Sequence, residues 1–78
     1  MKPEEFAHKF MQTAADMGCA MSPSGNVVCP GGKNISAGKA AAVYKRHGAD
    51  TAKAPSAEFR NEPNSLKLFR SIAAKALG

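Results

Sequence analysis

The sequence predicts a small single-domain α+β protein in which an amphipathic helix, a short β-hairpin and further helices follow in the order α-β-β-α-α. Apolar residues recur at helical spacing near both ends of the chain, and in the middle they alternate as in a strand. Glycines and prolines separate these segments. The chain has 78 residues, of which 44% are apolar. This length suits one modest core and one compact domain over residues 1–78.

The first helix is predicted from about Pro3 to Met17. Proline suits the first helical position, because its missing N–H would have no partner there. Glu4 and Glu5 follow at the positive end of the helix dipole, and Gly18 suits the left-handed conformation that ends many helices. One apolar stripe at helical spacing predicts the buried face of this helix: Phe6, Phe10, Ala14 and Met17.

The next segment, from Cys19 to Cys29, predicts a β-hairpin. A three-residue loop over residues 23–25 places Met21 opposite Val27 and the two cysteines opposite each other. Alternation then puts these four side chains on one apolar face. Opposed cysteines at this register are a candidate disulfide pair. In a cytoplasmic protein, however, we expect reduced thiols that pack as small hydrophobic side chains.

A cluster of breaker residues, Pro30–Asn34, ends the second predicted strand. Ser36 then caps a helix from about Ala37 to His47, and Gly48 ends it.

A polar connector over residues 49–55 leads to a predicted helical turn, in which Ser56 is the cap and Phe59 the last residue. A final helix is predicted from about Asn64 to Leu77, on the periodicity of its apolar residues. The apolar stripes together predict the core of the protein: Phe6, Phe10, Met17, Val27, Val43, Phe59, Leu66, Phe69 and Ile72.

The net charge of +5 is distributed unevenly along the chain. Residues 1–32 carry two cations and three anions, whereas residues 33–78 carry nine cations and three anions. We therefore expect a neutral scaffold of helix and hairpin over 1–32 and a basic helical part over 33–78. Clustered Lys and Arg attract phosphates or acidic protein surfaces. The alternative is a solvated surface that only keeps a small protein soluble.

Catalytic and metal chemistry find no support in the spacing of the residues. The two cysteines are ten positions apart and His8 and His47 are thirty-nine apart, whereas structural zinc sites pair their ligands within a single turn. Gly31, Gly32 and Lys33 resemble part of a phosphate-binding loop between a strand and a helix, but the pattern lacks the first glycine and the following Ser or Thr. We expect no enzyme, no metal and no cofactor.

Residues 40–48 resemble the first helix and turn of helix-turn-helix DNA readers. The residues that follow, 49–55, do not supply a recognition helix after a turn of three to four residues. The resemblance therefore ends after nine residues.

The leading hypothesis is a small non-enzymatic accessory protein of the cytoplasm that binds nucleic acid, mainly at its phosphates. Tyr44 lies near cations and is the candidate for base stacking. No segment reaches the ~20 apolar residues of a membrane span. The candidate binding residues for nucleic acid or an acidic partner are Lys33, Lys39, Lys45, Arg46, Lys67, Arg70 and Lys75.

Two other functions fit the same features. One is a protein-binding inhibitor or adaptor, of the size that phages and other mobile elements encode, docked on a larger and perhaps nucleic-acid-processing complex. The other is a self-assembling structural component joined through exposed Phe59 or Leu68.

Overall fold

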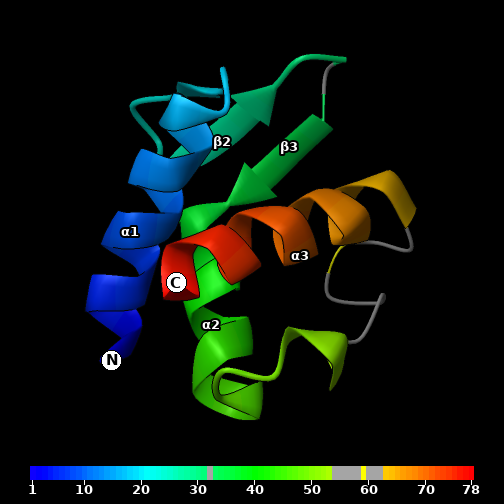
Figure 1. The fold of residues 1–78 in the computed structure, drawn as a ribbon. Coiled ribbons are helices and arrows are strands. Elements are labelled where there is room, and N and C mark those ends of the chain that lie inside the picture. Colours follow the sequence, from blue (N-terminus) through cyan, green and yellow to red (C-terminus); the bar gives the residue numbers. More distant parts are fainter. Residues whose placement is uncertain (32, 54–58, 60–62) are drawn as a thin grey trace.

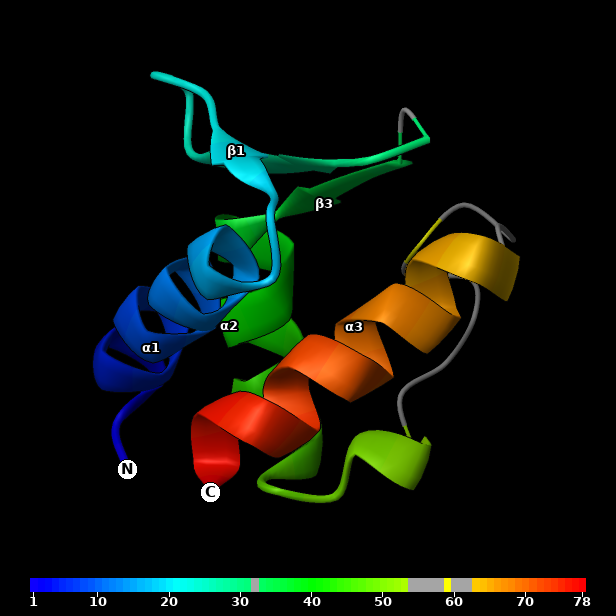
Figure 2. The ribbon, with the colours of Figure 1, turned by 45° about the horizontal axis from the view of Figure 1, so that its top comes forward.

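A computed structural model shows three α-helices on one side of a three-stranded antiparallel sheet (Figures 1 and 2). The structure describes residues 1–31, 33–53, 59 and 63–78. The predicted α+β class is confirmed, and the order α-β-β-β-α-α includes a strand that the sequence did not predict. The elements are α1 (Pro3–Asp16), β1 (Ala20–Met21), β2 (Asn26–Cys29), β3 (Lys33–Ser36), α2 (Ala37–His47), the 3-10 turn η1 (Thr51–Lys53) and α3 (Pro63–Leu77).

Helix α1 begins at Pro3, as predicted, and ends at Asp16, within one residue of the prediction. Its end has the geometry of a Schellman motif, because the amide of Cys19 donates a hydrogen bond to the carbonyl of Ala14 at 3.0 Å. Gly18 provides the left-handed residue of this motif, with a φ of 89°. The chain therefore turns directly from α1 into the first strand.

Strands β1 and β2 pair in the predicted register, with Met21 opposite Val27. The loop closes where the amide of Ser22 donates to the carbonyl of Asn26 at 2.8 Å. Ala20 lies opposite Val28, so the next pair outward is the two cysteines, which are joined as a disulfide.

The expectation of reduced thiols is therefore wrong for this structure. The Cα atoms of Cys19 and Cys29 are 4.2 Å apart, because directly opposed residues of an antiparallel pair approach this closely. Their side chains face the core together with Val27, as predicted. Met21 departs from that prediction, since it is 47% exposed. It is the last residue of a two-residue edge strand, which has a neighbouring strand on one side only.

Strand β3 occupies the place where the sequence predicts the end of a breaker cluster and a loop. It pairs with β2 so that Ile35 lies opposite Val27 and Lys33 opposite Cys29. Gly31 belongs to the turn between the two strands and has a φ of 95°. Ile35 is the one large apolar residue of this short strand, so no alternation marked it in the sequence. Since β2 and β3 share a sheet, the sheet joins the neutral and the basic part of the chain.

Helix α2 has the predicted bounds and the predicted caps. The side-chain oxygen of Ser36 accepts a hydrogen bond from the amide of Lys39 at 3.4 Å. Gly48 follows the last helical residue with a φ of 65°. The last turn of α2 is basic, and cationic side chains are stabilising there because they lie at the negative end of the helix dipole.

Helix α3 begins at Pro63, one residue before the predicted start, and ends at Leu77 as predicted. Proline again takes the first helical position. Of the helical turn predicted from Ser56 to Phe59, the structure describes only the last residue, and the rest of the turn lies outside the described residues. The two chain ends lie near each other at one end of the molecule in both ribbon views (Figures 1 and 2).

Every aromatic side chain of the protein belongs to one continuous row of ring contacts. Tyr44 of α2 stacks on Phe6 of α1, with ring centroids 4.7 Å apart. Phe6 contacts Phe10 at 5.9 Å, and Phe10 contacts Phe69 of α3 at 5.7 Å. Phe69 in turn contacts Phe59 at 5.0 Å. This row joins all three helices, and each such pair contributes about 0.5–1.5 kcal/mol beyond its burial.

Most of the predicted core is correct. Met17 and Leu66 differ, because they are half-buried and pack against the core from outside. Phe59 is only 6% exposed, and Leu68 is half-buried against the same core. The expected exposure of Phe59 is therefore wrong, whereas Leu68 keeps part of its side chain exposed, and self-assembly through it stays a hypothesis. The predicted residues that the structure buries are Phe6, Phe10, Val27, Val43, Phe59, Phe69 and Ile72.

Candidate nucleic-acid interface

The seven cationic residues of the predicted site lie on three different elements. Lys33 begins β3, and its side chain is outside the described part of the structure. The other six residues are exposed and divide equally between two helices. They are Lys39, Lys45 and Arg46 on α2 and Lys67, Arg70 and Lys75 on α3.

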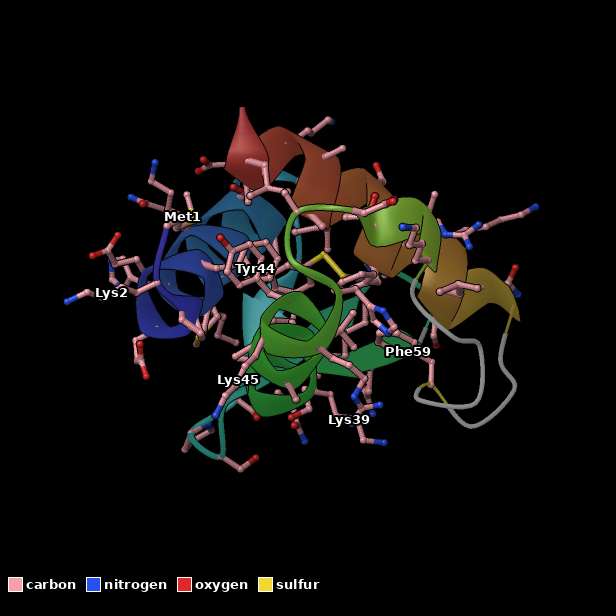
Figure 3. All side chains as sticks on the ribbon, turned by 90° about the horizontal axis from the view of Figure 1, so that it is seen from below. Met1, Lys2, Lys39, Tyr44, Lys45 and Phe59 are labelled. Carbon is pink, nitrogen blue, oxygen red and sulfur yellow. A yellow bond between two sulfur atoms is a disulfide. The ribbon has the colours of Figure 1, made fainter. Side chains whose placement is uncertain are left out.

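The exposed side of α2 has small residues along its centre and cations on both flanks. With 3.6 residues per turn, Gly38 and Ala42 lie at the centre of this side. Lys45 lies on one flank, whereas Lys39 and Arg46, about two turns apart, share the other. Figure 3 shows Lys39 and Lys45 leaving α2 on different sides. The backbone of α2 can therefore approach a surface closely while cationic groups reach around it on both flanks.

The sequences of α2 and α3 contain no acidic residue. The acidic residues that the structure describes are Glu4, Glu5 and Asp16 of α1, together with Asp50. The carboxylate of Asp50 lies 3.6 Å from the ammonium group of Lys53. Neither exposed helix side therefore has a carboxylate of its own that would repel a phosphate.

The exposed side of α3 has a row of hydrogen-bond donors along its length. Asn64, Lys67, Ser71 and Lys75 follow one another at steps of three or four residues, and all four are exposed. The row extends about 16 Å along the helix at 1.5 Å per residue. Each of these side chains can donate to a phosphate oxygen. Arg70 lies beside the row and donates to the carbonyl of Ala52 in η1 at 3.3 Å.

The two basic helix sides do not form one surface. In Figure 3, α3 lies along the upper edge of the molecule, and Lys39 and Lys45 extend from the side of α2 that faces away from it. The sequence places all of these cations in one basic part, whereas the structure divides them between two faces.

Tyr44 is not placed to stack on a base held by the exposed side of α2, because it lies on the side of this helix that packs against α1, where its ring stacks on Phe6. Its hydroxyl donates a hydrogen bond to the backbone carbonyl of Met1 at 2.7 Å, which ties the start of the chain to α2. The other aromatic rings are buried in the core. Among the described residues, neither basic face therefore offers an aromatic ring for stacking.

The other sequence features give no site. The glycine turn after β2 leads into strand β3 and not into a helix N-terminus, so the phosphate-binding arrangement suggested by Gly31, Gly32 and Lys33 does not form there. The described residues contain no cluster of three metal-ligating side chains. No helix in the described ranges is long and apolar enough to cross a membrane.

Sequence reasoning found the cations and missed the residues between them. Gly38 and Ala42 decide the shape of the exposed side of α2, and Asn64 and Ser71 complete the row on α3. All four could have been found by placing each predicted helix on a wheel and reading its polar side as well as its apolar one.

A comparison of the chain with models of known protein families, with curated proteins and with solved structures finds no match in any of the three.

Proposed function

We propose that the protein binds duplex DNA without catalysis and without sequence specificity, through the exposed side of α2. One observation carries this proposal: a helix without acidic residues has a smooth centre of Gly38 and Ala42 and cations on both flanks. The major groove of B-DNA is about 12 Å wide and admits an α-helix, with a phosphate strand on each side. Lys45 would contact one strand, and Lys39 and Arg46 would contact the other.

The exposed side of α2 lacks groups at its centre that could read base edges, and this bears on which kind of nucleic acid it would bind. Glycine and alanine at the centre of its exposed side cannot donate to or accept from base edges, so the contacts would be to phosphates. The major groove of duplex RNA is too narrow and deep for side chains to read. Single strands are usually held by aromatic stacking, and the described aromatic rings are committed to the core. Duplex DNA is therefore the preferred ligand.

The test is binding of a short duplex DNA across a salt series. Three phosphate contacts give a slope of about −2.7 for the logarithm of affinity against the logarithm of salt concentration, which is about a 40-fold loss between 50 and 200 mM. Replacing Lys45 by alanine should reduce the magnitude of this slope by about 0.9, to a loss of about 12-fold. Lys9→Ala is the matched control, because it removes the same charge from the exposed side of α1.

Two results would contradict the proposal. One is the absence of duplex binding by the unmodified protein at low salt. The other is an equal change of slope in the Lys45→Ala and Lys9→Ala variants, which would mean that net charge and not α2 controls binding. Single-stranded DNA and duplex RNA of the same length should bind more weakly than duplex DNA.

Work in the cytoplasm is part of this proposal, since DNA is found there in cells without a nucleus. Disulfides are rare in that compartment, because cellular thiols reduce them. The proposal therefore requires DNA binding that does not depend on the Cys19–Cys29 bond. The bond ties β1 to β2 and involves no residue of α2. Equal affinity with and without a thiol reductant is expected, and a loss of affinity on reduction would argue against a cytoplasmic role.

A protein-binding inhibitor or adaptor is the second candidate, and it uses the open face of the sheet. Ala20, Val28 and Asn34 lie side by side across the three strands and are exposed on the side away from the helices. This uncharged face suits a protein partner better than phosphates. A pull-down from nuclease-treated extract tests this function. Recovery of one stoichiometric protein would favour it over DNA binding if Val28→Arg abolishes the recovery and Lys45→Ala leaves it unchanged.

A further inference from the structure

We propose that α3 carries a second phosphate-binding face and that one molecule bridges two DNA duplexes. This inference rests on the proposed function of α2 and extends it. The basic residues of α2 and α3 lie on two separate faces of the molecule. The exposed side of α3 carries no acidic residue and has four donor side chains in one row, of which Lys67 and Lys75 are cationic. This charge and donor pattern complements a strand of phosphates.

Because the basic faces of α2 and α3 point in different directions, they would bind two separate duplexes. Lys39 and Lys45 extend away from α3 in Figure 3, so a duplex held on the exposed side of α2 lies on the far side of the molecule from α3. The Cα atoms extend over 26 × 25 × 21 Å, and the hydrophobic core fills the space between the helices. A straight duplex bound to one face cannot reach the other. Phosphates on α3 would therefore belong to a second duplex, held about one protein thickness away.

The row on α3 differs from the face of α2 in the contact that it can make. Its cations and hydroxyl follow one line along the helix, with Ser71 between Lys67 and Lys75. The face of α2 instead has cations on two flanks. We therefore expect α3 to lie along a single phosphate strand and to bind more weakly than α2. Arg70 supports this arrangement from the side, because its bond to the Ala52 carbonyl ties η1 to α3.

The experiment captures a fluorescent duplex on beads that carry an immobilised duplex, with protein added at low salt. The unmodified protein should retain the fluorescent duplex on the beads. The Lys67→Ala, Lys75→Ala variant should still bind a single duplex in solution, with an unchanged salt slope, and should lose capture down to the level without protein. Lys9→Ala should keep both activities. All the replaced lysines are exposed, so thermal unfolding should show the same fold for each variant.

The outcomes separate this inference from the proposed function. Binding of a single duplex without capture of a second one would overturn bridging and leave the function of α2 in place. Absence of any duplex binding would overturn both. Capture that survives Lys67→Ala, Lys75→Ala would show that molecules bridge by self-association, and would equally overturn a second face on α3. Light scattering of the unmodified protein without DNA should show a monomer.

Discussion

Reduction of the Cys19–Cys29 disulfide should lower the free energy of unfolding by about 2.7 kcal/mol. The two cysteines are ten positions apart, and closing a loop of that length removes about 9 cal/mol/K of entropy from the unfolded chain in the chain-entropy model. For a domain of this size the loss corresponds to a decrease in Tm of roughly 10–20 °C, at about 4–8 °C per kcal/mol. The stabilisation is a large share of the 5–15 kcal/mol typical of a folded domain.

Thermal unfolding followed by circular dichroism, with and without excess reductant, measures this difference. A Cys19→Ala, Cys29→Ala variant is the control, because its Tm should not respond to reductant. That variant should be less stable than the reduced protein as well, since both cysteine side chains are buried and their sulfur atoms would leave small cavities. Equal Tm values for oxidised and reduced protein would refute the reasoning, as would two titratable thiols in denatured protein that never met a reductant.

Three further perturbations test the local structure by chemical denaturation. Gly18→Ala should destabilise the protein by about 1–2 kcal/mol, because φ is 89° there. Gly38→Ala in α2 should instead stabilise it by about 0.5–1 kcal/mol, since an added Cβ makes only an ordinary contact of 3.5 Å. Changes of the same sign in the free energy of unfolding of the two variants would contradict these expectations. Tyr44→Phe keeps the stacking and loses one hydrogen bond, so a cost of about 0.5–1.5 kcal/mol is expected, and no change would mean that the bond is not formed in solution. Ile35→Val should lower the free energy of unfolding by about 0.5–1.5 kcal/mol. Val28→Ala on the exposed sheet face should change it by no more than about 0.5 kcal/mol. Equal losses of stability in the two variants would contradict the assignment of the two sheet faces.

The helices could be predicted because their signals are local. The caps at Pro3, Ser36 and Gly48 mark helix ends through backbone chemistry that does not depend on the rest of the fold. The register of the first hairpin also followed from local information, since the loop length determines which residues face each other. These features are correct to within one residue.

The third strand and the surface could not be predicted in the same way. β3 forms as a strand by pairing with β2. A four-residue segment with a single large apolar side chain shows no alternation of apolar and polar residues that would predict a strand. The separation of Lys45 from Lys67 depends on how α2 and α3 pack on α1, which no local pattern contains. Net charge along the chain therefore selected the exposed cations of α2 and α3 as candidates and could not predict that they lie on two faces.

The aromatic row gives the protein a built-in optical reporter. The chain has one tyrosine and no tryptophan, so Tyr44 dominates the intrinsic fluorescence. Its ring stacks on Phe6 of α1, and its hydroxyl donates a hydrogen bond to the Met1 carbonyl. Detachment of the start of α1 from α2 would change the emission before the rest of the fold unfolds. Fluorescence and circular dichroism recorded during the same unfolding experiment would then show whether the chain start is released separately or together with the core.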